Sequence, residues 1–276
     1  MLLYSKEKTM TRKPVVAGQF YPSQKSGIEK QIKGFVDKDK KKEKVIAAVS
    51  PHAGYIYSGA VAGAVFSRVD LPSTIVILGP NHSGIGATAS LMAEGEWEMP
   101  SGNVVINSEL SNLILEESNY LKNDSIGHSK EHSLEVQVPF IQYFLEDFTI
   151  VPIALMQIDY QICEDVGSAI FKGIEKFNKE VLIIASTDMT HFESHEYAKK
   201  MDKLAINEIL NLDPDGFYDT VKSNHISMCG YIPTTVTLIS SKLLGAKEAE
   251  LVDYRTSGEA SGDYDHVVGY AGLLIK

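Results

Sequence analysis

Two histidines follow apolar, strand-like runs of the chain in matching contexts. His52 lies in "AAVSPHAGYIYSG" (47–59), and His82 lies in "TIVILGPNHSG" (74–84). In each stretch a proline restricts the backbone just before the histidine, and a glycine permits a tight turn soon after it. Such a turn holds an imidazole in place, as a metal ligand or a general base requires. Either histidine alone would also suit a strand-end cap, but the matching pair predicts a shared functional site.

A third polar group follows another apolar run. The stretch "STDMTHFESHE" (186–196) contains Asp188, His191 and His195. A carboxylate in the turn after a strand can orient a nearby imidazole, so we expect Asp188 to orient His191. Capping of the next helix is the alternative role for this aspartate. We expect His195 to be an exposed residue of the first helical turn.

The stretch "GHSKEHSLEVQVPF" (127–140) has the order H-x-x-E-H through His128, Glu131 and His132. This order occurs in inverted zinc peptidases, but five common polar residues make a weakly specific pattern. We therefore expect Glu131 and His132 to orient a ligand of the metal or to contact substrate, and we do not predict a peptidase.

Cys229 precedes Gly230 at a predicted helix start. A helix N-terminus favours the thiolate, which suits a nucleophile or a soft metal ligand. The alternative is a small buried apolar residue, which is the commonest environment of a free cysteine and the one we expect for Cys163. The chain has no Walker A loop and no Gly-x-Ser-x-Gly turn, which disfavours nucleotide binding and serine hydrolase chemistry.

Alternating strands and helices must position these residues. Apolar runs predict buried strands at 44–50, 74–79, 148–155, 180–186 and 266–275, and helices are predicted at 58–69, 160–177, 194–210 and within 211–245. The pattern predicts a single-domain α/β sandwich with a central, largely parallel sheet flanked by helices. Residues 88–107 predict a small inserted β-hairpin. Ligands bind outside the carboxyl ends of parallel strands, where the candidate residues lie.

Composition narrows the function further. The chain of 276 residues carries a formal net charge of −10, which argues against a nucleic-acid-binding face. Because its apolar stretches are too short, we expect no membrane-spanning segment and no secretion signal. Its two cysteines cannot form a disulfide framework, which favours the cytoplasm. We expect residues 1–12 to form a loose tail, with Met10 as an alternative start to Met1, and residues 13–276 to form the domain.

Six motifs occur in an order that resembles the Memo family, also called protein B of the AmmeMemoRadiSam system. They are "AGQFYP" (17–22), "SPHAGYIYSG" (50–59), "LGPNHSG" (78–84), "EHSLEVQVPF" (131–140), "STDMTH" (186–191) and "MCGYIP" (228–233). The resemblance covers the chain from about residue 13 onward. This family in turn resembles the class III extradiol ring-cleaving dioxygenases in fold.

The resemblance implies a metal bound by His52, His82 and Cys229. It gives His191 the position of the acid–base histidine of the dioxygenases, with Asp188 close by. Ring-cleaving dioxygenases bind iron through two histidines and a glutamate, whereas a thiolate is softer and more easily oxidised. The resemblance therefore implies a metal site but not simple ring cleavage. Iron is the expected cofactor, with copper or zinc as alternatives.

The motifs also contain residues expected beside the ligands of the metal. Tyr55 and Asn81 join Glu131 and His132 as expected substrate-binding or ligand-orienting residues. The family's association with an AMMECR-type protein and a radical SAM protein implies these two as partners.

The leading functional hypothesis is a metal-dependent redox protein or oxidoreductase acting on a small molecule or a peptide. A zinc-dependent hydrolase would use the same ligands with a bound water. The third hypothesis is a protein- or peptide-binding scaffold with a vestigial metal pocket and an aromatic rim of Tyr55, Tyr57 and Trp97.

Overall fold

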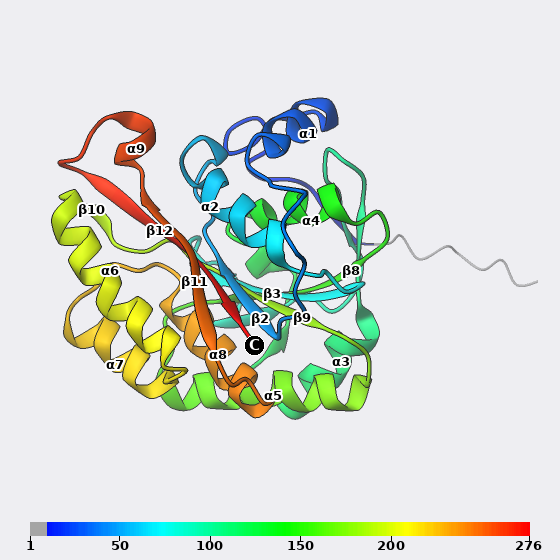
Figure 1. Cartoon of the computed structure of the whole chain (residues 1–276). Coiled ribbons are helices and arrows are strands. Elements are labelled where there is room, and N and C mark those ends of the chain that lie inside the picture. The colour runs from blue at the N-terminus through cyan, green and yellow to red at the C-terminus, as the bar shows by residue number, and fades with distance from the viewer. Residues whose placement is uncertain (1–9) are drawn as a thin grey trace, which may run out of the picture.

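Four continuously apolar runs become the parallel centre of one sheet. In the computed structural model, which describes residues 10–276, they are β2 (Ala47–Ser50), β3 (Thr74–Pro80), β8 (Thr149–Leu155) and β9 (Leu182–Ser186). They lie in the order β8-β3-β9-β2 and are parallel to one another. Nearly every residue of these strands is buried. This is expected for strands that helices cover on both faces, and Figure 1 shows these helices.

Further strands, some parallel and some antiparallel to their neighbours, extend the sheet on both sides. Beyond β2 lie β12 (Val267–Ile275), β11 (Ala249–Thr256) and β10 (His191–Glu193). Beyond β8 lie β6 (Val104–Ile106), β5 (Glu96–Trp97), β1 (Thr11–Arg12), β4 (Ala89–Leu91) and β7 (Lys122–Asn123). The antiparallel pair β5–β6 is the predicted inserted hairpin, and it continues the edge of the sheet.

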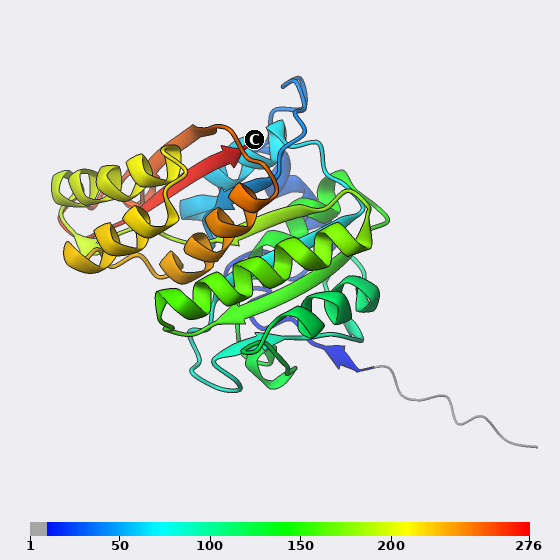
Figure 2. The same cartoon turned by 90° about the horizontal axis from the view of Figure 1, so that it is seen from below.

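Helices cover both faces of the sheet (Figures 1 and 2). One face packs against α1 (Lys25–Lys33), α2 (Tyr55–Arg68) and α4 (Val138–Phe144). The other packs against α3 (Ser108–Glu117), α5 (Tyr160–Phe177), α6 (His195–Leu210), α7 (Pro214–Ser223) and α8 (Tyr231–Leu243). Short turns η1 (Ile126–His128) and η2 (Glu135–Gln137) precede α4, and α9 (Gly258–Ser261) lies between β11 and β12.

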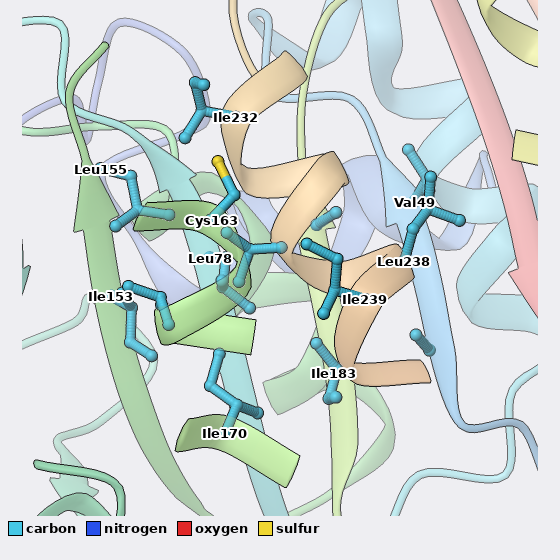
Figure 3. Packing of buried hydrophobic residues seen from close by; sticks show 14 of the residues in the cluster. Val49, Leu78, Ile153, Leu155, Cys163, Ile170, Ile183, Ile232, Leu238 and Ile239 are labelled. Atoms are coloured by element: carbon cyan, nitrogen blue, oxygen red, sulfur yellow. The ribbon is translucent and has the colours of Figure 1, made fainter. Parts of the chain in front are cut away.

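Alternate residues of each central strand enter two separate cores. Leu78 of β3 and Ile183 of β9 pack with α5 and α8, as Figure 3 shows. Their neighbours Ile77 and Ile184 point to the opposite face and pack with α2 and α4. The strands are therefore buried from both sides, which fixes their ends and the turns that follow them.

The α/β fold with a largely parallel central sheet is confirmed. The helical region predicted at 211–245 divides into α7 and α8, and the division leaves Cys229 just before α8. Strand β11 escaped prediction because its sequence, "AELVDYRT", carries charges and is only half-buried.

The predicted loose tail at residues 1–12 lies mostly outside the described residues. Its last two residues contradict the prediction, since Thr11 and Arg12 form β1 and pair with β5. Among residues 10–276, every helix is too short or too polar to cross a bilayer.

Candidate metal centre

The register of the parallel strands gathers the candidate residues at one edge of the sheet. Ser50, the last residue of β2, pairs with Ser186, the last residue of β9. His52 and Asp188 lie two residues beyond these strand ends, and His82 lies two residues beyond the end of β3. Their convergence therefore follows from the parallel topology.

Three imidazoles meet at this edge, and we call His52, His82 and His132 the histidine cluster. One nitrogen from each ring lies within 4.8 Å of a nitrogen from each of the others. The His52 side chain is 2% exposed, that of His132 is 22% exposed and that of His82 is 36% exposed. The cluster thus has a buried floor and one side that is open to solvent.

Hydrogen bonds fix the protonation of the His52 ring. The Ser186 hydroxyl donates its single proton to the Ser133 carbonyl at 2.6 Å and accepts a bond from the Gln137 amide at 2.7 Å. His52 Nδ1 lies 3.0 Å from the same hydroxyl oxygen, so Nδ1 must be the donor. The lone pair of the His52 ring is therefore on Nε2, which is the form that a metal ion needs.

Glu131 fixes the His82 ring in the same way. Its carboxylate accepts the backbone N–H of His82 at 2.5 Å and the ring Nδ1–H at 2.9 Å. It also accepts the backbone N–H groups of His132 and Ser133. Burial acts to raise the pKa of Glu131, but these hydrogen bonds and the nearby imidazoles outweigh it and lower the pKa to about 2. The buried Glu131 carboxylate thus orients the His82 ring through Nδ1 and leaves Nε2 for a metal ion.

His132 lies beside His82, with ring centroids 4.7 Å apart. It was expected to orient a ligand or to contact substrate, and the structure brings it into the histidine cluster itself. Because His132 follows Glu131 in a loop and not a strand end, the strand-end pattern could not single it out. Burial lowers the pKa of His132 and holds that of His52 well below 6.5, so both rings are neutral.

Cys229 lies against the buried side of the cluster. Its Sγ is 3.4 Å from His52 Nε2 and accepts the backbone N–H of Asp188 at 3.3 Å. Burial, together with the Asp188 carboxylate, raises the pKa of the Cys229 thiol. In the metal-free protein burial therefore favours the thiol over the thiolate that a helix N-terminus would favour. A bound metal ion would displace the proton.

The predicted pairing of Asp188 with His191 is also wrong. Asp188 accepts the backbone N–H of His52 at 2.8 Å and lies 4.0 Å from His52 Nε2. The Nδ1 of His191 instead donates to the Ser227 carbonyl at 2.9 Å. Strand β10 pairs with β12, and this turns His191 toward the segment before Cys229. The Ser227 carbonyl engages only Nδ1 of His191, so this contact leaves Nε2 available to accept a proton.

Tyr55 and Asn81 are the other two residues predicted to bind substrate or to orient a ligand. Tyr55 is buried and donates to the Val136 carbonyl at 2.8 Å, so the substrate-binding alternative of its prediction is wrong. The Asn81 carbonyl oxygen accepts from Ser83 and Gly84 and shapes the turn that carries His82.

Three further predictions concern His195, the H-x-x-E-H pattern, which was not expected to form a peptidase site, and the aromatic rim. His195 begins α6 and is partly exposed. His128 is buried and contacts the Ser90 carbonyl, away from the histidine cluster, so H-x-x-E-H is not a metal motif here. Trp97 is buried, as is Tyr55, so the expected aromatic rim does not form.

Comparisons with known proteins give matches that cover nearly the whole chain. A family described as "Memo-like protein" matches residues 12–274. A MEMO1 family protein of Methanopyrus kandleri is 40% identical over 97% of this chain and 99% of its own length. One of Desulfurococcus amylolyticus is 43% identical over 95% of this chain and 98% of its own length.

A solved structure shares the fold at low sequence identity. An uncharacterized protein from Escherichia coli K12 superposes with a TM-score of 0.52 and 11% identity, over 84% of this chain and 100% of that one. This likeness extends to the α/β architecture alone.

Proposed function

The chain belongs to the Memo family, and from this premise we propose that it is a metal-dependent oxidoreductase that holds an iron ion at the histidine cluster. The observation that carries the proposal is the convergence of three imidazoles at one edge of a parallel sheet. Two of the rings, His52 and His82, have Nδ1–H groups bound to fixed acceptors, so each presents the lone pair of Nε2.

The donor set fits a divalent transition metal. Imidazole nitrogen suits iron, copper and zinc, and the Cys229 sulfur beside His52 adds a soft donor that suits the same three metals. The Glu131 carboxylate behind His82 is the partner that metal-bound histidines commonly have. Iron would supply one-electron redox chemistry at a site that is partly exposed through His82 and His132, and a small molecule or a peptide would reach it from that side.

His191 supplies the acid–base function in this proposal. Its Nδ1 is held by the Ser227 carbonyl, so Nε2 can take a proton from a substrate atom and return it. The His191 side chain is partly exposed, whereas Asp188 is buried against the backbone of His52. Asp188 therefore shapes the turn that carries His52 and does not assist His191 directly.

A zinc-dependent hydrolase is the second candidate, and the third histidine favours it. Three histidines with an open position form a donor set in which zinc lowers the pKa of a bound water to about 7. The scaffold hypothesis has less support, because Tyr55 and Trp97 of its aromatic rim are buried.

Elemental analysis of protein purified without oxygen or chelator tests the proposal. Variants His82→Ala, His132→Ala and Cys229→Ala should each lose metal, while His266→Ala, an exposed histidine outside the cluster, should keep it. Near-stoichiometric iron that depends on the cluster supports the oxidoreductase, and copper would redirect the redox assignment to that metal. Stoichiometric zinc would favour the hydrolase. Metal-free protein that cannot be reconstituted would overturn both candidates.

The partners implied by the family are part of the same proposal. An AMMECR-type protein and a radical SAM protein would deliver or receive the molecule on which the site acts. Co-purification of each with the full chain, compared with the His82→Ala variant, tests whether they bind and whether binding needs the metal.

A further inference from the structure

We propose that Arg12 is a positioning residue of the metal centre: its buried guanidinium fixes the loop of residues 128–135, here called the Glu131 loop, in the conformation that aims Glu131 at His82. The inference rests on the proposed metal binding. It gives a function to the first strand of the described chain, which lies more than a hundred residues from the loop in sequence.

The guanidinium bridges two backbone carbonyls of the Glu131 loop. Arg12 is 6% exposed. Its Nε donates to the His128 carbonyl at 2.8 Å, and its Nη2 donates to the Glu131 carbonyl at 2.5 Å. Its central carbon lies 4.1 Å from the centroid of the Trp97 ring, which covers one face of the cation. Arg12 thus holds the loop at two points three residues apart.

The end of the same loop holds Arg12 in turn. Glu135 Oε2 lies 2.8 Å from Arg12 Nη1, and both side chains are almost fully buried. The Glu135 carboxylate also accepts the backbone N–H groups of Val15 and Val16 and the hydroxyl of Tyr21. A buried carboxylate with these donors needs its cation, because removing one partner leaves the other charge uncompensated.

Glu131 connects this network to the histidine cluster. The Glu131 carbonyl accepts from Arg12, while the Glu131 carboxylate accepts the backbone and ring N–H groups of His82. The same carboxylate accepts the backbone N–H of His132, so two members of the histidine cluster depend on where Glu131 lies. Arg12 contacts none of the three imidazoles, so any effect on metal binding must pass through the loop.

Arginine suits this role in a way that lysine does not. The carbonyls of His128 and Glu131 accept hydrogen bonds from Nε and Nη2, and the Glu135 carboxylate forms an ion pair with Nη1, so each partner meets a different nitrogen of one planar group. A lysine ammonium keeps the charge but cannot span three acceptors with a fixed plane. The variant Arg12→Lys therefore separates geometry from charge.

The test measures the affinity of the full chain for Zn²⁺ by chelator competition. Loss of a group that orients metal ligands costs about 10- to 100-fold in affinity. We expect about tenfold for Arg12→Lys, because Arg12 acts on His82 through Glu131 and not directly. Arg68→Lys is the matched control, since Arg68 also pairs with two carboxylates, those of Glu43 and Glu250, outside this network. Wild-type affinity in Arg12→Lys, or an equal loss in Arg68→Lys, would overturn the proposal.

A second measurement uses the wild type and so does not depend on the folding of a variant. Because coupling is reciprocal, Zn²⁺ should slow amide exchange at Val15 and Val16 as well as in the Glu131 loop. Slowing confined to the loop would contradict a role for Arg12. A wild-type protein that binds no Zn²⁺ and no iron would overturn the proposed function first, and this inference with it.

Discussion

The carboxylate of Glu131 accepts both the backbone N–H and the ring Nδ1–H of His82, at 2.5 and 2.9 Å. One side chain therefore sets the position of the turn and the rotation of the imidazole that it carries. The pKa of Glu131, lowered to about 2, keeps this acceptor ionised across the physiological range. The pair forms the carboxylate–histidine arrangement that accompanies many metal sites.

Replacing Glu131 by Gln should weaken metal binding about 10- to 100-fold. The amide has one oxygen to accept and one NH₂ group that cannot accept, so some of the four N–H groups now bound must lose their partner. Zn²⁺ affinity measured by chelator competition checks the prediction. Glu196→Gln, at an exposed carboxylate on α6, is the control, and equal affinities in the two variants would contradict the assigned role.

Ser186→Ala should lower metal affinity by removing the acceptor of His52 Nδ1–H. Without it the ring can place its proton on Nε2, where the lone pair is needed. Nitrogen-15 chemical shifts of the His52 ring report the tautomer directly. Ser111→Ala removes a hydroxyl that is equally buried but outside this network. A His52 tautomer unchanged by Ser186→Ala would show that another group sets it.

His191→Gln should reduce turnover by about 10²- to 10⁴-fold and leave metal content unchanged. The glutamine can still donate to the Ser227 carbonyl, but it cannot take up a proton. Metal analysis checks the predicted metal content, and single-turnover kinetics, once a substrate is found, check the predicted loss of turnover. Loss of metal together with activity would instead make His191 a ligand.

The sequence predicted the positions of His52 and His82 because parallel topology leaves little freedom at strand ends. Apolar runs mark strands buried on both faces, and residues two positions past such strands must share an edge. The family resemblance added Cys229, and its sulfur does lie beside His52. Whether it binds the metal stays a prediction.

His132 and the partner of His191 could not be predicted in this way. His132 reaches the cluster from a loop whose path depends on Arg12, a contact across more than a hundred residues. Asp188 is near His191 in sequence, but the short strand β10 directs the histidine toward Ser227. Local spacing gives proximity along the chain, whereas these pairings depend on tertiary contacts.

A buried carboxylate away from the metal centre connects α6 to the antiparallel edge of the sheet. Asp202 accepts the backbone N–H of Thr190 at 2.9 Å and the hydroxyl of Tyr254 at 2.8 Å. Burial raises the pKa of Asp202 above 3.8 although both hydrogen bonds act to lower it. The folded protein therefore binds this proton more tightly than the unfolded chain does.

Stability should consequently fall as the pH rises through the folded-state pKa of Asp202. The contribution of this proton to the free energy of unfolding is fully present below about pH 3.8, the pKa of Asp202 in the unfolded chain. It is lost above the pKa of Asp202 in the folded protein. Asp202→Asn carries no such proton, so its free energy of unfolding should rise relative to the wild type as the pH increases from about 3.8 through the folded-state pKa of Asp202. Urea unfolding at several pH values measures this difference, with Asp219→Asn on the exposed face of α7 as the control. A difference that stays constant with pH, or that shrinks as the pH rises, would show that the ionised form of Asp202 is the one the fold prefers.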